Sequence, residues 1–296
     1  MQPLGNRLLY GLAASVLGAL ARLPLGLAYW LGARLGDLLY LVLAERRRIT
    51  RANLALALGA DKTAAERHQL ARTTFRNLGQ HLVDFSHLAR LTPDAFTAMC
   101  HVEGLEHIEA LLRRRKGLLI LSAHFGSWEL APAIALCLTT PVHVIVRPLD
   151  NPALQCLAEA YRQRCGYRAI PRRAALTACL QVLRRGEIVA VLMDQSGLRR
   201  ESVQVEFFGT KAYTSIGPAL LALRTGCPVV SAFLIRAGQG RHRLVFSQEI
   251  PVHRTGHVPH DLVENTRAFT HIIETYVRRY PDHWFWLHRR WKQRPA

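Results

Sequence analysis

The segment LLILSAHFGSWEL, residues 118–130, constrains the fold more than any other part of the chain. Leu118 to Ser122 is a run of large aliphatic residues ending in a small one, which is typical of a buried strand in an α/β sheet. His124 follows on the loop that we expect at the carboxyl end of this strand. Open α/β sheets place their ligand sites at that end, so the segment predicts a fold class and a functional site together.

A histidine and a glutamate stand at H-x4-E spacing across the predicted turn. Gly126 allows the turn and Ser127 is a suitable N-cap, so we expect a helix to begin at Trp128. With His124 before the cap and Glu129 in the first helical turn, the two side chains can converge. A carboxylate on one imidazole nitrogen fixes the tautomer and stabilises the cation, so we predict that Glu129 orients His124 as a general base.

The same spacing also fits a loop histidine beside an unrelated glutamate, because a negative charge is favoured at any helix start. The sequence has no G-x-S-x-G elbow beside this pair and no obvious protein nucleophile. If the pair is catalytic, the substrate's own hydroxyl would therefore be activated for direct attack.

Further apolar segments are predicted as strands, and two of them end on polar side chains. The segments span residues 142–152, 190–197 and 205–230, and the last contains a glycine–aromatic loop and a helix before its strand. The polar residues at the strand ends are Arg147, Asp194 and Gln195. Side chains delivered by several strand ends are what a pocket needs, so we predict a pocket around His124.

Five blocks occur in the order HFGSWE, VIVRPLDNP, MDQSG, FFGTKAYTSIGPALLA and HWFWLHRRWKQRP. In this order they resemble the late acyltransferases of lipid A biosynthesis, the lauroyl and myristoyl transferases of the lysophospholipid acyltransferase superfamily. The resemblance extends from the N-terminal apolar segment to Pro295. It implies a single α/β domain, with a mixed sheet flanked by helices as in glycerolipid acyltransferases, and an N-terminal membrane-associated helical segment.

The resemblance also implies a reaction. A fatty acyl chain would pass from an acyl-carrier-protein thioester to a hydroxyl of a lipid A precursor, with no covalent acyl-enzyme. His124 matches the catalytic base of the family and Glu129 its acidic partner. Arg147 matches the arginine of the second superfamily motif, and Asp194 falls where a third-motif acidic residue lies.

The remaining site expectations follow from the same resemblance and from the reaction. Ser127, through the turn it belongs to, and Arg147 are candidates to stabilise the oxyanion. The aromatic pair before Gly209 and the helix after it would line a channel for the acyl tail. We expect neither a cofactor nor a metal ion. The residues assigned to substrate binding are Arg147, Asp194, Gln195, Phe208 and Gly209.

The N-terminal region is strongly apolar over residues 8–44 and is followed by the basic run Arg46–Arg48. Leu23 to Ala44 has about the ~20 residues that a membrane-spanning helix requires. Arg34 and Asp37 interrupt it, but at a spacing of three they can pair on one helix face.

We divide the chain into a membrane-anchoring helical segment, residues 1–48, and an acyltransferase domain, residues 49–296. A secretory signal peptide is disfavoured, because the apolar region is too long and too interrupted. A buried or interfacial helical hairpin remains the alternative. The arginines after the segment favour a cytoplasmic catalytic domain, and the resemblance implies the inner membrane.

A formal net charge of +18 calls for anionic partners. Anionic lipid headgroups, the acidic acyl-carrier protein and a phosphorylated glycolipid acceptor all satisfy this requirement. A nucleic-acid partner is disfavoured, because no helix-turn-helix, zinc-finger or RNA-binding signature is present in the sequence. The aromatic residues between Trp284 and Trp291 are expected to pack near the site or at the membrane interface.

Two alternatives to the predicted function remain open from the sequence. The same site could acylate a lysophospholipid, an ornithine lipid or a phosphoinositide mannoside, because the motif reports the chemistry and not the acceptor. From another class, the chain could be a non-catalytic membrane-surface protein that binds anionic lipid.

Overall fold

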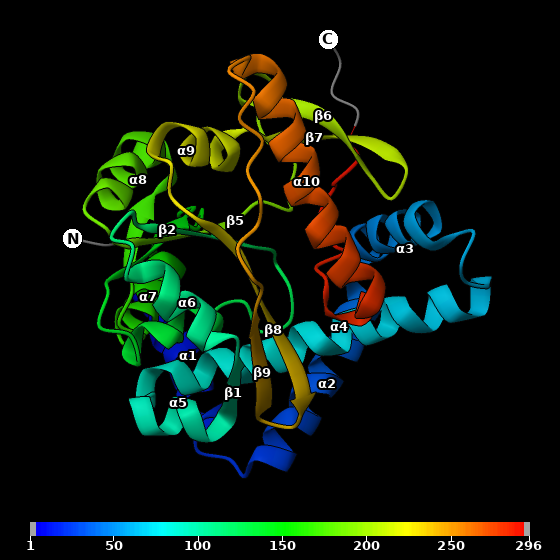
Figure 1. The fold of residues 1–296 in the computed structure, drawn as a ribbon. Coiled ribbons are helices and arrows are strands. Elements are labelled where there is room, and N and C mark those ends of the chain that lie inside the picture. The colour runs from blue at the N-terminus through cyan, green and yellow to red at the C-terminus, as the bar shows by residue number, and fades with distance from the viewer. Residues whose placement is uncertain (1–3, 293–296) are drawn as a thin grey trace.

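The computed structural model describes residues 4–292, so the end of the last resemblance block, including Pro295, lies outside the described residues. Within the described residues, seven strands form one mixed sheet in the order β1-β9-β8-β2-β5-β3-β4 (Figure 1). Neighbouring strands are parallel except for β8 and β9. The strands of this sheet are β1 (Cys100–Glu103), β2 (Leu118–Ser122), β3 (Val142–Val146), β4 (Arg168–Pro171), β5 (Ile188–Leu192), β8 (Val229–Gly238) and β9 (Arg241–Phe246). The predicted α/β class with a mixed sheet is confirmed.

The predicted strand Leu118–Ser122 is the central strand β2, between β8 and β5. Because β2, β3 and β5 are parallel, their carboxyl ends meet at one edge of the sheet. The loops that follow these strands contain His124, Arg147 and Asp194, as the sequence predicted.

The predicted glycine–aromatic loop is the tip of a separate antiparallel hairpin, formed by β6 (Ser202–Phe207) and β7 (Thr210–Ser215). Phe208 and Gly209 form its two-residue turn, with φ angles of +54° and +68°. Positive φ at both turn positions matches the right-handed twist of the flanking strands, which explains the tight connection.

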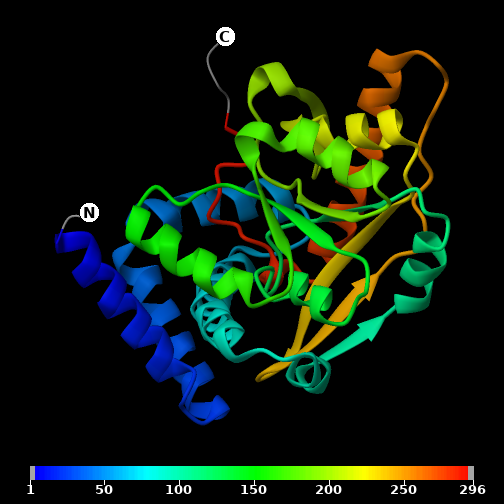
Figure 2. The ribbon, with the colours of Figure 1, turned by 90° about the vertical axis from the view of Figure 1, so that its left-hand side faces the viewer.

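Helices cover both faces of the sheet (Figures 1 and 2). Buried side chains of α8, α9 and α10 pack on one face, and those of α5, α6 and η2 pack on the other. The helices are α1 (Leu4–Leu20), α2 (Leu25–Val42), α3 (Ala44–Leu58), α4 (Ala64–His87), α5 (Pro93–Met99), α6 (Leu105–Leu112), α7 (Pro152–Gln163), α8 (Ala175–Arg184), α9 (Gly217–Thr225) and α10 (Val258–Arg279). Short 3₁₀ turns complete the fold: η1 (Leu88–Arg90), η2 (Ala131–Leu136), η3 (Arg172–Ala174), η4 (Arg199–Glu201) and η5 (Pro281–His283).

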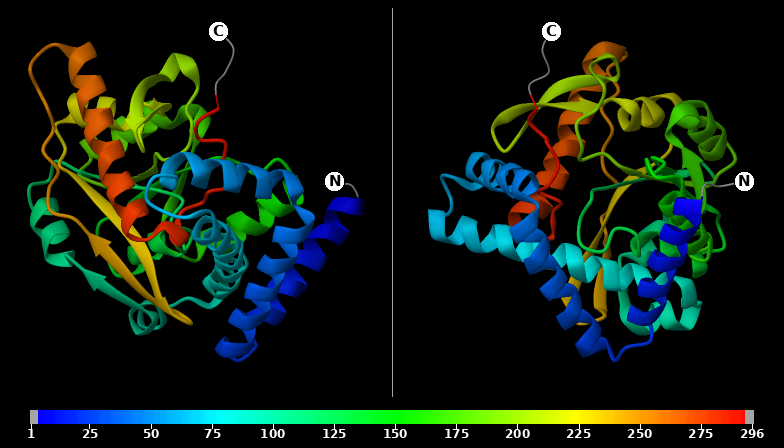
Figure 3. Two further views of the ribbon diagram at one scale, coloured as in Figure 1. Left: turned by 90° about the vertical axis from the view of Figure 1, so that its right-hand side faces the viewer. Right: turned by 180° about the vertical axis from the view of Figure 1, so that it is seen from behind.

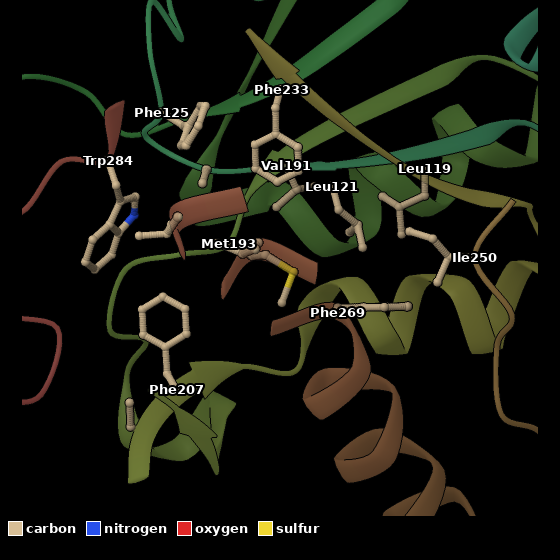
Figure 4. Close-up of a cluster of buried hydrophobic side chains, with 14 of the residues drawn as sticks. Leu119, Leu121, Phe125, Val191, Met193, Phe207, Phe233, Ile250, Phe269 and Trp284 are labelled. Atoms are coloured by element: carbon tan, nitrogen blue, oxygen red, sulfur yellow. The ribbon is translucent and has the colours of Figure 1, made fainter. Parts of the chain in front are cut away.

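Alternation along the strands separates two apolar clusters. Leu119 and Leu121 of β2 point with Val191 of β5 into the cluster that contains Phe269 of α10 (Figure 4). The residues between them face the opposite side of the sheet, because successive side chains of a strand point to opposite faces. That opposite face lines one of the two cavities beside His124.

Helices α1 and α2 form a hairpin on one side of the molecule, where α1 contacts α7 and α2 lies along α4 (Figures 2 and 3). Among the described residues, α2 is the one helix long and apolar enough to cross a membrane, and 28% of it is buried. Its outer face exposes large apolar side chains, including Leu27, Trp30, Leu31, Leu35, Leu38 and Leu41. The predicted pair of Arg34 and Asp37 is confirmed at 3.0 Å, and Asp37 also accepts a hydrogen bond from Arg76 of α4.

Glycines bring α2 and α4 into backbone contact. Gly32 and Gly36 stand four residues apart on α2 and face Gly79 on α4, the arrangement that lets two helices approach closely. A Cβ built at Gly79 would lie 1.9 Å from the carbonyl oxygen of Gly32. The helix pair can therefore approach this closely only with glycine at the crossing.

We expect Gly79→Ala to destabilise the protein by about 1–3 kcal/mol, because the added methyl group must push the two backbones apart. Gly11→Ala is the matched control, since a Cβ at this exposed position of α1 meets nothing within 4 Å. The control should be neutral or stabilising by up to about 1 kcal/mol. Thermal unfolding of both variants in detergent measures the difference, and equal melting temperatures would contradict the close-packing argument.

Candidate active site

His124 lies on the loop after β2, and the segment that follows η5 holds the backbone of this loop. The amide of Phe285 donates to the carbonyl oxygen of His124 at 3.0 Å, and the amide of Gly126 donates to the carbonyl oxygen of His283 at 2.9 Å. Gly126 has a φ of +56°, and a Cβ there would lie 1.9 Å from the carbonyl oxygen of Leu234. Glycine is required at this turn, and the imidazole is held on a fixed backbone.

The carboxylate that contacts His124 belongs to Asp194, on the loop after β5. Asp194 Oδ1 lies 2.8 Å from His124 Nδ1, and Asp194 Oδ2 accepts a hydrogen bond from Trp284 Nε1 at 2.8 Å. Asp194 is buried, while about a quarter of the His124 side chain is exposed. A carboxylate on Nδ1 keeps the proton on that nitrogen and leaves Nε2 to accept a proton.

The electrostatics of this pair suit a base. Burial by itself would lower the pKa of His124, but the charge and hydrogen bond of Asp194, with a contribution from Glu129, raise that pKa above its ordinary value. Burial would raise the pKa of Asp194, but His124 and the hydrogen bond from Trp284 hold that pKa below its ordinary value. Asp194 is therefore an anion across the physiological pH range and stabilises a protonated imidazole.

Glu129 does not occupy the position predicted for it. Its carboxylate forms a two-point ion pair with Arg162 of α7, including a 2.8 Å bond from Nε to Oε2. The predicted helix at Trp128 is also replaced by a turn followed by the 3₁₀ helix η2, so Glu129 is directed toward α7 instead of Nδ1 of His124. The hydrogen-bonding partner of His124 is Asp194, which is 70 residues further along the chain.

A first cavity of about 610 Å³ opens beside His124 and extends along the face of β2, β3 and β5. We call it the apolar cavity. It continues past Ile120, four residues before His124, which corresponds to about 13 Å of strand. The apolar side chains on its walls include Ile120, Val142, Val144, Ala190, Ala232, Leu244 and Phe246. The ion pair of Glu129 with Arg162 is part of the wall near its mouth.

A second cavity of about 810 Å³ opens on the other side of His124, against the N-terminal half of α9. We call it the basic cavity, because its lining includes the arginines Arg147, Arg172, Arg173 and Arg200. His288 also lines it, and burial lowers the pKa of this histidine to about 4, so it is neutral at physiological pH. The two cavities share His124, Ile145, Arg147, Leu192 and Gln195. The histidine therefore lies where two chemically different spaces meet.

Two predicted binding residues lie at this meeting point. The side-chain amide of Gln195 is 3.2 Å from Nε2 of His124, the nitrogen that would accept a proton. Arg147 lines both cavities with 70% of its side chain exposed and lies 3.2 Å from Asp150. Both side chains can therefore reach a group bound beside the imidazole.

Four predicted positions lie outside the cavity linings described within residues 4–292. Asp194, predicted to bind substrate, is buried against His124 and lines neither cavity. The hydroxyl of Ser127 is buried and donates to Asp84. Phe208 is buried at the hairpin tip, where its amide donates to Glu274 at 2.7 Å, and Gly209 follows it in the turn. The aromatic–glycine turn therefore supports the aromatic packing around the site and does not line a channel, whereas α9, which follows the hairpin, does line the basic cavity.

Sequence reasoning missed two contributions to the site. Trp284 anchors Asp194. The sequence predicted that this aromatic run packs near the site or at the membrane interface, and in the structure Trp284 packs at the site. Arg162 pairs with Glu129 from the last turn of α7, and nothing in its local sequence distinguishes it from the other arginines of the chain. The position of Asp194 at a strand end was the available signal for its role.

The family model for bacterial lipid A biosynthesis acyltransferases matches residues 6–293. The chain belongs to this family. A lipid A biosynthesis palmitoleoyltransferase of Escherichia coli K12 is 28% identical over 284 residues, covering 95% of this chain and 90% of that protein. A lipid A biosynthesis lauroyltransferase of the same organism is 29% identical over 289 residues, covering 96% and 91%. A phosphatidylinositol mannoside acyltransferase of Mycobacterium tuberculosis is 27% identical over 142 residues, covering 47% and 45%. Membership of this family of lipid A acyltransferases supports acyl transfer to a lipid A precursor.

We expect the pKa of His124, measured by NMR titration of the imidazole in this lipid A acyltransferase, to lie above the ordinary value of about 6.5. Asp194→Asn should lower this pKa, because the variant removes the anion that favours the imidazolium. His253→Ala, at an exposed loop position, is the control, and this variant should leave the pKa of His124 unchanged. An unchanged His124 pKa in folded Asp194→Asn would contradict the pairing.

Proposed function

We propose that this lipid A acyltransferase moves a fatty acyl chain from an acyl-carrier-protein thioester to a hydroxyl of a lipid A precursor, with His124 as general base and no covalent acyl-enzyme. The observation that carries the proposal is the position of His124 between the two cavities, with Nδ1 bound to Asp194 and Nε2 facing their meeting point. A base between an acyl site and an acceptor site can activate one substrate against the other without a protein nucleophile.

The apolar cavity would hold the acyl tail. Its floor is built from aliphatic side chains of the sheet, where burial of a hydrocarbon chain is favourable by about 0.8 kcal/mol per methylene group. Small side chains at Ala190 and Ala232 leave the space between larger neighbours. The depth of the cavity would therefore set the accepted chain length.

The basic cavity would hold the polar part of the reaction. Its arginines suit phosphate groups, because a guanidinium donates to phosphate oxygens in pairs. This charge fits a phosphorylated acceptor whose hydroxyl reaches Nε2 of His124. The excess of basic residues in the chain fits acidic acyl-carrier protein and an anionic membrane surface.

The reaction would proceed by one attack on the thioester. The acceptor O–H gives its proton to Nε2 of His124 while its oxygen bonds to the thioester carbon, and the imidazolium is stabilised by Asp194. The tetrahedral intermediate then breaks its C–S bond, and the leaving thiolate takes the proton back from the imidazolium. Arg147 and Gln195 are the side chains positioned to donate to the oxyanion. The hydroxyl of Ser127 donates to Asp84, so this residue remains a candidate only through the backbone amides of its turn.

Glu129 would act with Asp194 in this scheme. Its charge adds to the elevation of the His124 pKa, although the carboxylate is bound to Arg162. Glu129 and Arg162 together would shape the mouth of the apolar cavity, where the thioester must sit. Glu129 would therefore contribute to catalysis through its charge and its position at the cavity mouth, without contacting His124.

The N-terminal segment, residues 1–48, would attach the acyltransferase domain, residues 49–296, to the inner membrane with the site on the cytoplasmic side. The exposed leucines of α2 and the basic run in α3 support this arrangement, because a membrane interface favours apolar side chains and an anionic lipid surface attracts cationic ones. The partial similarity to a phosphatidylinositol mannoside acyltransferase favours one alternative acceptor class, a mannosylated phosphoinositide.

We expect His124→Ala to lower acyl transfer by about 10²–10⁴-fold, because general-base assistance has this magnitude. The assay combines acyl-carrier-protein thioesters with under-acylated lipid A precursor, and mass spectrometry detects the added acyl mass. His253→Ala, a histidine in an exposed loop, is the control and should keep wild-type turnover. Full turnover by folded His124→Ala would disprove the proposed base.

We expect Ala190→Leu to shift the preferred acyl chain to shorter lengths, since the larger side chain fills the middle of the apolar cavity between Ile120 and Val144. Competition among thioesters of different chain length, with products separated by mass, measures the shift. Leu154→Phe adds volume at an exposed position of α7 and should leave the preference unchanged. An unaltered preference in Ala190→Leu would remove the acyl tail from this cavity.

A further inference from the structure

A buried polar cluster lies outside the two cavities. We call it the Asp84 cluster, and it consists of Tyr29, Asp84, Ser127, Arg236 and His242. These residues come from α2, α4, the loop after β2, β8 and β9. Asp84 has a 1% exposed side chain, so its charge has been removed from water and depends on these partners.

Both carboxylate oxygens of Asp84 are used. Oδ1 accepts a hydrogen bond from the hydroxyl of Tyr29 and lies 3.2 Å from Nε2 of His242. Oδ2 accepts from the hydroxyl of Ser127 and, at 2.8 Å, from Arg236. Arg236 also donates to the Ser127 hydroxyl at 3.1 Å, so the serine is held from two sides.

The cluster reaches the catalytic loop through two neighbouring residues. Ser127 lies three residues after His124. The next residue, Trp128, lines the apolar cavity, and its ring contacts the His124 ring edge-on, with centroids 5.6 Å apart. The Trp128 ring also stacks on His81, with centroids 3.8 Å apart, and contacts the ring of Phe285. His81 and Asp84 stand three apart on α4, so one helix face holds both Ser127 and Trp128.

At the other end the cluster reaches the N-terminal hairpin. Tyr29 is buried on the inner face of α2, and its neighbour Trp30 is exposed on the outer face with the leucines. One hydrogen-bonded path therefore runs from α2 through Asp84 to the loop that carries the base. The side chains of the Asp84 cluster neither line the two cavities nor take part in the proposed reaction. Their connection to the site is the loop that carries His124.

We propose that Asp84 is a positioning residue, which couples the seating of α2 to the placement of His124 by binding Tyr29 and Ser127 at once. The inference rests on the proposed function, in which His124 is the base. A displacement of a reacting group by about 1 Å can cost as much as about 100-fold in rate, so loosening this path affects turnover more than binding. Helix α2 also bears the exposed apolar face. If α2 were displaced, Tyr29 would no longer bind Asp84, and the catalytic loop would be held less firmly.

The test is Tyr29→Phe, which removes one hydrogen bond and leaves Asp84 paired with Arg236. We expect kcat to fall about five- to tenfold with the KM values for thioester and acceptor unchanged. Tyr40→Phe is the matched control, because Tyr40 is also buried on α2 but its hydroxyl has no hydrogen-bond partner among the described residues. The control should keep wild-type kcat. Equal kcat values for the two variants and wild type would overturn the inference.

Ser127→Ala combined with Tyr29→Phe adds a second readout. Since both substitutions act through Asp84, the double variant should lose less activity than the product of the single losses. Ser127→Ala with Tyr40→Phe should show only the loss of Ser127→Ala. Independent, multiplying losses for Ser127→Ala and Tyr29→Phe would show that Asp84 does not connect them.

Hydrogen exchange makes the inference testable without substrate. The amides of residues 123–128 should exchange faster in Tyr29→Phe than in wild type. Their exchange rates in Tyr40→Phe should equal those of wild type. Wild type and His124→Ala are assayed beside these variants. If wild type is active, His124→Ala is inactive and Tyr29→Phe behaves as Tyr40→Phe in rate and exchange, the positioning role alone is wrong. If wild type transfers no acyl group, the proposed function fails, and unchanged exchange in Tyr29→Phe would independently overturn the coupling.

Discussion

The carboxylate of Asp194 holds three separate parts of the molecule at one point. One oxygen binds the imidazole on the loop after β2, the other binds the indole of Trp284, and the residue itself continues β5. A buried anion is costly unless it is fully hydrogen-bonded, so each of these partners is needed to keep it there. Arg290, also buried, adds a nearby positive charge that attracts Asp194, while its own hydrogen bonds go to Tyr213 and Thr214. The orientation of the base thus depends on the C-terminal segment as much as on the sheet.

The sheet provides the second constraint. Strand alternation sends Leu119 and Leu121 into one core and Ile120 and Ser122 toward the apolar cavity. Small residues such as Ala190 on the cavity face prevent that face from filling completely. A long apolar space and a close-packed core can therefore share one strand, and the packed side gives rigidity to the open side. His124 lies two residues after the end of the same strand, so the position of the base relative to the cavity floor is fixed.

Buried polar groups recur around the catalytic loop. The Asp84 cluster holds Ser127, the Glu129–Arg162 pair forms part of the cavity wall, and Asp194 holds His124. Replacement of such groups by apolar residues is often neutral or stabilising in proteins, so stability alone does not explain them. These polar contacts fix side-chain orientations that apolar packing leaves free, and the orientation of the base matters where a proton must be transferred. The glycine contacts between α2 and α4 play the same part for the backbone, because they place Tyr29 within reach of Asp84.

The sequence by itself determined the fold class, the strand that ends before His124, the polar strand ends at Arg147 and Asp194, and the ion pair of Arg34 with Asp37. These follow from local patterns, since strand periodicity and helix spacing are fixed by backbone geometry. Tertiary structure alone decided which carboxylate meets the imidazole. Glu129 is close in sequence, but the turn at Trp128 directs it toward Arg162, while β2–β5 pairing brings Asp194 across 70 residues to Nδ1. The Asp84 cluster was equally hidden, because contacts among five separate segments arise from packing and leave no periodic signal in any one of them.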